Sequence, residues 1–208
     1  MTKNERDEAA MSPRVGLDLN RLVQTAGEIA DEHGLDEVTL ARLAHRLGIR
    51  PPSIYNHVHS LADLRNQLAV YGLKLLAEDM ARAAVGRSKD EAVRAVAQAY
   101  VAFARSHPGL YEATLRAPDP NHAELREAAE QVVDLVVRVL QAYSLKDEEA
   151  LHAVRGLRSL LHGFASLEQK GGFGLPLDRD VTLRYIVDTF LAGIRANSSR
   201  TAERGKRP

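Results

Sequence analysis

Apolar residues along this chain recur mostly three or four positions apart, which places them on one face of an α-helix. Valine, isoleucine and threonine are scattered and do not alternate with polar residues as they would in a strand. Glycine and proline interrupt the pattern at intervals of roughly 15 to 25 residues, and alanine, leucine, glutamate and arginine fill the spaces between them. The sequence therefore predicts an all-α protein.

The composition of the 208-residue chain excludes several classes of site. Because the chain has no cysteine, it can form neither a disulfide nor a thiolate metal site, and it has no cysteine nucleophile. Its apolar runs are far shorter than the roughly 20 residues of a membrane-spanning helix, and its polar start lacks a signal-peptide core. We therefore expect a cytoplasmic protein without a membrane partner, and the sequence predicts no cofactor, metal ion or catalytic residue.

The chain divides into four segments. Residues 1–16 are polar and aperiodic, so we expect a flexible arm, and residues 197–208 are expected to form a disordered tail. Residues 17–65 are predicted to form a head of three short helices, and residues 66–196 a larger helical domain. Helices are expected at about residues 18–34, 39–47, 53–59, 61–84, 88–105, 108–115, 122–143, 147–169 and 179–195.

Cap residues mark the helix boundaries in the head. Asp18 and Thr39 are predicted to begin the first two helices, because their side-chain oxygens can accept from free N–H groups of a first turn. Gly34 and Gly48 are predicted to end them. Ser60, with an acidic residue three positions later, predicts a capping box at the start of the following long helix.

Charge is distributed unevenly in the head. Six acidic residues and one arginine lie between Leu17 and Val38, whereas four arginines and one aspartate lie between Thr39 and Arg65. A basic segment beside an acidic helix is compatible with nucleic-acid binding, although such a face is often merely solvated. The net charge of zero excludes only a uniformly basic surface.

The packing residues of a helix-turn-helix lie in this basic segment. Ala44 is a small residue suited to a helix crossing, and Gly48, four positions later, is suited to the turn. Leu43, Ile49 and Ile54 supply apolar anchors on both sides. Because these residues lie between two short helices with basic side chains, the pattern favours a DNA-binding unit over a plain helical hairpin.

A larger set of positions matches a known family: Gly34, Val38, Thr39, Leu40, Ala44, Gly48, Ile49, Ser53, Tyr55, His57 and Leu64. With these residues, the segment of about 17–68 resembles the N-terminal DNA-binding domain of TetR-family transcriptional regulators. One position departs from the family pattern, because Leu61 replaces a lysine that usually contacts phosphate. We expect Arg65, one turn later, to substitute for it in part.

The third helix is expected to present its N-terminal residues to base edges in the major groove. Pro51 and Pro52 suit a thymine methyl group, Ser53 can donate to a base or phosphate, and Arg50 can reach a guanine edge or the backbone. The resemblance implies that Tyr55 and His57 contact phosphates. Thr39 and Arg42 complete the predicted DNA-binding set, the first through its hydroxyl and helix-end N–H groups and the second through its charge.

The last two predicted helices carry broad apolar stripes, listed here by helix: Leu151, Val154, Leu157, Leu161 and Phe164; Leu183, Ile186, Val187, Phe190, Leu191 and Ile194. The resemblance implies that these two helices from each of two subunits form a four-helix interface of a homodimer. The alternative is a fully intramolecular core.

A pocket for a small-molecule effector is also predicted in the larger domain. Its candidate residues are Tyr100, Phe103, Tyr111, Leu115, Val136, Leu140, His162 and Phe164, with His107 and Arg158 as polar contacts. The alternative is that these aromatic residues simply fill the core. The pair His162-Gly163 resembles the C-terminal domain of one TetR subgroup, but Arg158 stands where that subgroup has a tryptophan.

The sequence thus predicts a dimeric, ligand-responsive transcriptional regulator, expected to be a repressor, that binds palindromic operator DNA and is released by a small molecule. One alternative is an α-helical metal-dependent enzyme. Such a bundle needs two Glu-x-x-His motifs, and only Glu149 with His152 supplies one. The other alternative is a dimeric helical scaffold that does not bind DNA.

Overall fold

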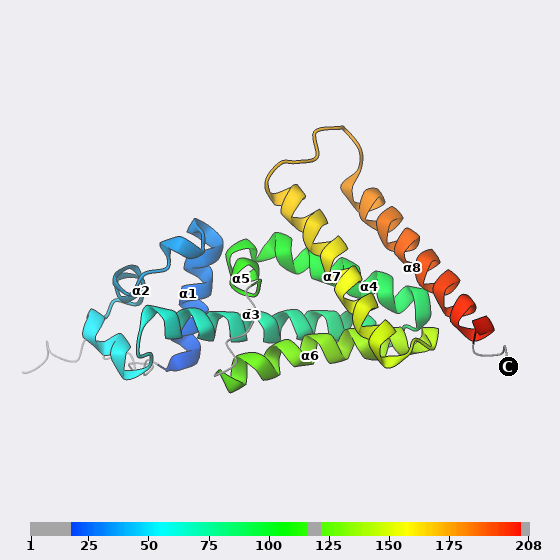
Figure 1. Cartoon of the computed structure of the whole chain (residues 1–208). Coiled ribbons are helices and arrows are strands. Elements are labelled where there is room, and N and C mark those ends of the chain that lie inside the picture. Colours follow the sequence, from blue (N-terminus) through cyan, green and yellow to red (C-terminus); the bar gives the residue numbers. More distant parts are fainter. Residues whose placement is uncertain (1–17, 116–121, 205–208) are drawn as a thin grey trace, which may run out of the picture.

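The computed structural model describes residues 18–115 and 122–204, and within these ranges its regular elements are all helices, which confirms the all-α prediction (Figure 1). The predicted arm, residues 1–16, lies outside the described residues. In chain order the elements are α1 (Leu19–His33), η1 (Leu35–Glu37), α2 (Leu40–Leu47), η2 (Pro51–Asn56), α3 (Leu61–Ala84), α4 (Lys89–Ser106), α5 (Pro108–Ala113), α6 (Ala123–Leu140), η3 (Gln141–Tyr143), α7 (Asp147–Gln169) and α8 (Arg179–Arg204).

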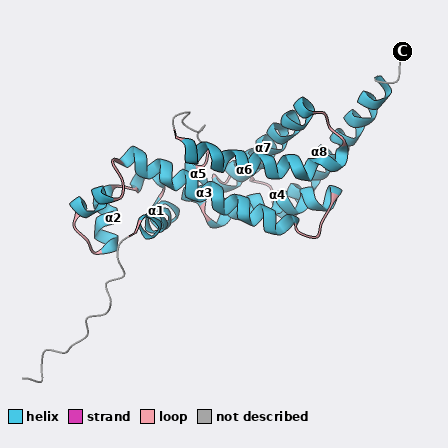
Figure 2. Cartoon of the chain, turned by 90° about the horizontal axis from the view of Figure 1, so that it is seen from below, coloured by secondary structure: helices cyan, strands magenta, loops and turns pink. Residues whose placement is uncertain are grey.

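The long helix α3 organises the molecule. In Figure 1 it runs through the centre, with α1, α2 and η2 at one end and α4 and α6 along its remaining length; Figure 2 shows the same arrangement from below. A single hydrophobic core continues from Leu22 and Leu43 in the head to Val101 and Leu161 in the larger part of the chain. The head is therefore packed onto the rest of the protein and not merely tethered to it.

The predicted cap residues form the expected contacts in the head. The Asp18 carboxylate accepts from the backbone N–H of Arg21 at 2.7 Å, and the Thr39 hydroxyl accepts from that of Arg42 at 3.1 Å. Gly48 ends α2 with a φ of +65°, a left-handed conformation in which glycine has no steric penalty. These caps fix the lengths of α1 and α2 and the turn that follows them.

The third helix differs from the prediction. We expected a helix from Ser53 to about His59, whereas the structure has a 3₁₀ helix, η2, at Pro51–Asn56. The two prolines occupy its first turn, where no N–H group is needed. It ends early because the Asp63 carboxylate accepts from the backbone N–H of His59 at 2.8 Å, while Ser60 caps α3 by accepting from the Asp63 N–H at 3.1 Å.

The C-terminal helix is longer than predicted. α8 continues to Arg204, beyond the expected end near residue 195 and into the segment for which a tail was expected. The physical reason is that neither glycine nor proline interrupts the chain between Arg195 and Arg204. Residues 205–208 lie outside the described part. No helix in that part is both long and apolar enough to span a membrane.

The short helix α5 joins the larger part of the chain to α1. Gly109 lies so close to α1 that a Cβ atom added to it would stand 2.0 Å from the backbone oxygen of Ala30. Beside this contact, the Asp31 carboxylate accepts from the backbone N–H of Leu110 at 2.8 Å and lies 2.9 Å from His107 Nδ1. We call this contact set the α1–α5 junction.

The junction gives a prediction for stability. Gly109→Ala should lower the free energy of unfolding by about 1–3 kcal/mol, because the new methyl group overlaps the α1 backbone and one helix must move. Gly27→Ala is the matched control on the other side of the same junction, since its Cβ would meet its nearest neighbours at an ordinary 3.8 Å. That variant should be neutral or more stable by up to about 1 kcal/mol.

Urea unfolding at one fixed protein concentration measures both effects. Equal unfolding midpoints for the two variants would show that Gly109 is not required for close packing.

Candidate nucleic-acid interface and internal cavity

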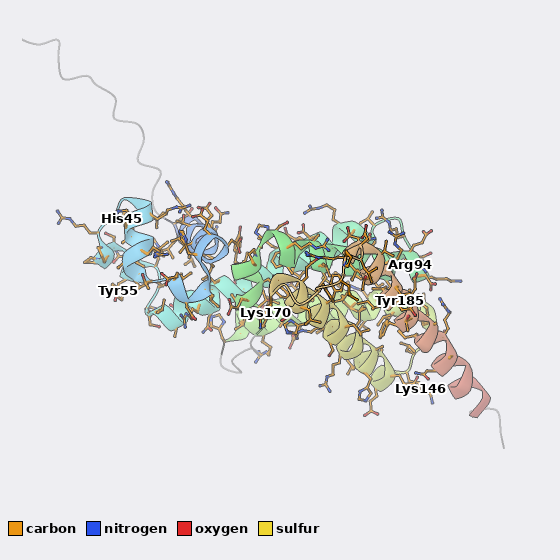
Figure 3. The ribbon with its side chains drawn as sticks, turned by 90° about the horizontal axis from the view of Figure 1, so that it is seen from above. His45, Tyr55, Arg94, Lys146, Lys170 and Tyr185 are labelled. Atoms are coloured by element: carbon orange, nitrogen blue, oxygen red, sulfur yellow. The ribbon has the colours of Figure 1, made fainter. Side chains whose placement is uncertain are left out.

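The element η2 presents an exposed polar and aromatic face. Ile54 is fully buried and anchors it to the head, as does Val58 just beyond its end. On the other side Arg50 and the two prolines are exposed, and the Tyr55 side chain is 56% exposed. Figure 3 shows Tyr55, with His45 of α2, at the end of the molecule away from Arg94 and Lys146. Tyr55 is therefore a surface residue and not part of the core.

The other predicted DNA-binding residues surround this face. Ser53 and His57 are half-buried on η2 and at its end, and Thr39 is exposed at the start of α2. The Thr39 hydroxyl already accepts the N-cap hydrogen bond, but its own proton remains available for donation to a phosphate oxygen. The fold thus brings α2's N-terminus and η2 onto one end of the head.

Opposite charges pair within the head. Arg46 donates to both carboxylate oxygens of Glu32 at 2.6 and 2.7 Å, and this hydrogen bonding lowers the pKa of Glu32. Arg42 lies 2.9 Å from Glu37, and Arg65 lies 3.5 Å from Asp36. Three of the four arginines of the basic segment are therefore paired with carboxylates of the acidic segment, and the Arg46 pair joins α2 to α1.

Arg50 differs from the other three arginines of the basic segment. It forms no ion pair with any carboxylate in the described part of the chain, and it stands exposed at the N-terminal end of η2. Arg42, which we also predicted to contribute to DNA binding, is engaged by Glu37. Arg50 is thus the arginine best placed to meet an outside anion.

A cavity of about 320 Å³ lies in the larger part of the chain, between α3, α4, α6 and α7. Most of its lining is aliphatic. Tyr100 lies in its wall, and Arg158 contributes a guanidinium group. The aliphatic wall, of which only Val136 was among the expected pocket residues, is formed by Leu73, Leu76, Met80, Val96, Val132, Val133, Val136, Val154, Leu157 and Leu161.

Phe103 and Phe164 do not line this cavity, which corrects the prediction. Both are buried in the packed core: the Phe103 ring lies 5.3 Å from that of His107, and the Phe164 ring lies 5.1 Å from that of Phe173. His107, predicted as a polar contact of the pocket, instead belongs to the α1–α5 junction.

Tyr111 and His162 reach the cavity only through a hydrogen-bond chain. The Tyr100 and Tyr111 hydroxyl groups are 3.0 Å apart, and the Tyr111 hydroxyl lies 2.8 Å from His162 Nδ1. Burial is the main cause that raises the pKa of both phenols, so both remain neutral donors at neutral pH. Tyr111 and His162 instead line a neighbouring groove of about 430 Å³ that also contains Ala30 and Asp31 of α1.

The apolar stripes of α7 and α8 face mainly inward. Of the residues predicted for the two stripes, Leu151 is half exposed, whereas Leu157, Leu161, Val187 and Leu191 are buried in the chain's own core. Besides Leu151, four large apolar side chains outside the predicted stripes are exposed on these helices, namely Leu160, Leu167, Val181 and Tyr185. These four residues were not predicted, because the helical spacing of apolar residues on α7 and α8 indicates mainly the face that is buried.

Among the described residues, no group of three or more histidine and acidic side chains could hold a metal ion, so this part of the chain offers no site for the metal-dependent enzyme considered as an alternative. Glu149 of the single Glu-x-x-His motif accepts from the backbone N–H of Lys146 at 3.2 Å, which is a role in capping α7.

Comparison with known sequences gives one family. The family model described as "Tetracyclin repressor-like, C-terminal domain" matches residues 93–190. The uncharacterized HTH-type transcriptional regulator YobS of Bacillus subtilis (strain 168) is 42% identical over 189 residues, which cover 90% of this chain and 98% of YobS.

Solved structures share the fold. A single-residue variant of TetR from Acinetobacter baumannii AYE, in complex with minocycline, is 20% identical with a TM-score of 0.69, over 88% of this chain and 99% of that chain. BioQ with its natural double-stranded DNA operator is 21% identical with a TM-score of 0.63, over 87% of this chain and 99% of that chain. The sequence relative, the family model and the helix-turn-helix head together show that this chain belongs to the TetR family of transcriptional regulators, which are not enzymes.

Proposed function

We propose that this chain is a dimeric transcriptional repressor that binds palindromic operator DNA through η2 and leaves it when a small molecule occupies the internal cavity. The observation that carries the proposal is the exposed face of η2, where Tyr55 and the ion-pair-free Arg50 project from a helix-turn-helix. A protein that acts on chromosomal DNA is expected in the cytoplasm.

The DNA-binding roles follow from where the side chains lie. Pro51 and Pro52 form a small apolar surface at the start of η2, which suits a thymine methyl group, and the adjacent Arg50 can reach a guanine edge or a phosphate. Tyr55 and His57 then contact phosphates that fix the position of η2 in the groove. BioQ, solved with its operator, supports this use of the shared fold.

Dimerisation is proposed through the outer faces of α7 and α8. Four large apolar side chains are exposed there, namely Leu160 and Leu167 on one side of α7 and Val181 and Tyr185 one turn apart on α8, which is typical of a surface that a partner covers. Figure 1 shows that both helices lie away from the head. A single η2 spans only six residues and contacts too few base pairs for tight binding. Two subunits related by a two-fold axis would place two such elements on half-sites roughly 34 Å apart.

Coupling between ligand and DNA is proposed through α5. Thr114, at its C-terminal end, lines the cavity, while Gly109 and Leu110 of the same short helix contact α1. A ligand that displaces the cavity end of α5 therefore moves the α1–α5 junction and, with it, the head. A hundredfold change in DNA affinity requires that the ligand favour the released form by about 2.7 kcal/mol. The minocycline complex of a protein with this fold supports such a ligand site.

The DNA-binding proposal predicts the effect of removing one charge. Arg50→Ala should weaken binding to DNA from the promoter flanking the gene by roughly tenfold or more, because a contact to a base or phosphate is lost in each half-site. Arg138→Ala is the matched control, since Arg138 is exposed on α6 and has the same charge. Fluorescence anisotropy across a salt series measures both affinities and their salt dependence.

Tyr55→Ala should likewise reduce affinity and leave the oligomeric state unchanged. If Arg50→Ala and Arg138→Ala weaken binding equally, net charge alone explains the effect and η2 is not the reading element.

The dimer proposal predicts a second outcome. Tyr185→Glu should produce monomers at micromolar concentration, because it places a charge in the proposed apolar interface. Val85→Glu is the control: Val85 is 75% exposed and Tyr185 73% exposed, but Val85 lies between α3 and α4, away from the interface. Sedimentation velocity measures both. A dimeric Tyr185→Glu variant, or a monomeric Val85→Glu variant, would contradict this assignment.

A further inference from the structure

The internal cavity has a chemistry more specific than that of a general ligand site. Its inner wall is aliphatic over α3, α4, α6 and α7, so the body of the occupant must be apolar. At about 320 Å³, and with about 30 Å³ for each water-sized group, the cavity accommodates roughly ten such groups. These dimensions suit a chain of about eight to twelve carbon atoms or a small ring system.

One polar position interrupts this wall. Arg158 extends from α7 toward the buried hydroxyl of Tyr100, and its charge opposes the rise that burial causes in the Tyr100 pKa. Arg158 forms no ion pair with any carboxylate among the described residues. A guanidinium group carries five N–H donors, so most of the donors of Arg158 remain available to a ligand.

The other charged residues around the cavity do not offer an equivalent site. Arg126 and Glu130 lie one turn apart on α6 and approach each other to 3.9 Å, so that their charges largely cancel. Asp134 on α6 and Arg158 on α7 are both exposed at the cavity, but of the two it is Arg158 that interacts with the hydroxyl of Tyr100. Arg158 is therefore the charge that combines contact with the buried Tyr100 and a free hydrogen-bonding capacity.

An occupant that covers Arg158 must supply it with an acceptor. A neutral apolar molecule would remove water from the guanidinium group and give nothing in return, which is unfavourable. A carboxylate can accept two parallel N–H bonds from the guanidinium group, a strong and directional arrangement. We propose that the cavity binds an amphipathic monoanion, whose carboxylate or similar head group lies on Arg158 beside Tyr100 and whose apolar body fills the aliphatic wall.

This inference rests on the proposed ligand response, and it names the class of the effector. It also explains why this chain has Arg158 where the TetR subgroup with the His-Gly pair has a tryptophan. The arginine replaces a flat apolar surface with a cation that selects an anion.

The test compares three probes of equal chain length by isothermal titration calorimetry of the full chain: decanoate, decan-1-ol and decyltrimethylammonium, all below their micelle concentrations. Decanoate should bind at least tenfold more tightly than either of the other two. Arg158→Met should reduce decanoate affinity at least tenfold while leaving decanol affinity unchanged or improved. Arg155→Met is the control, because Arg155 is exposed on the same helix and does not line the cavity.

Tighter binding of the ammonium probe, equal binding of all three, no binding of decanoate, or equal decanoate affinity in Arg158→Met and the wild-type chain would each overturn the inference. The DNA assay on the same preparation separates this failure from that of the proposed function. A protein that binds DNA but not decanoate refutes only the class of ligand, whereas a protein that binds decanoate but no DNA refutes the regulator and leaves the anion site standing.

Discussion

The contact between Gly109 and Ala30 determines how closely the head packs against the larger part of the chain. The backbone of α1 approaches α5 so closely that no side chain fits at position 109, and the Asp31 carboxylate holds the first turn of α5 through Leu110. Because α5 is only six residues long, its ends cannot move independently. Packing at one end and the cavity at the other therefore share a single short element, and in the proposed mechanism this element carries a change of volume in the cavity to the head.

Arginines in the head have two different roles: some form ion pairs that hold its helices together, and one remains available to bind DNA. The sequence alone does not show which arginine has which role. The bidentate pair of Arg46 with Glu32 links α2 to α1 and orients the helix-turn-helix. Being exposed, such a pair contributes modestly to stability, so its main effect is on geometry. Arg50 lies beyond the reach of the acidic helix and stays available. A head of nearly balanced charge can thus still present one unpaired cation to a phosphate backbone.

Sequence reasoning succeeded where the determinant is local. The caps Asp18 and Thr39 and the left-handed Gly48 depend on residues a few positions apart, and each was predicted correctly. It failed where the determinant is a crossing between distant segments. Helical periodicity shows that α7 is apolar on more than one side but not which side turns inward, so Phe164 was assigned to the pocket, whereas the structure buries it in the packed core.

In the proposed dimer, two copies of this chain hold their two heads at the spacing of DNA half-sites. Because the chain has no cysteine, Asn20→Cys on the exposed side of α1 gives one spin label per subunit. Double electron–electron resonance then measures the distance between heads. We expect a dimer whose distance distribution becomes single and narrow when operator DNA is added. Absence of any intersubunit distance, or a distribution that operator DNA leaves unchanged, would contradict the account.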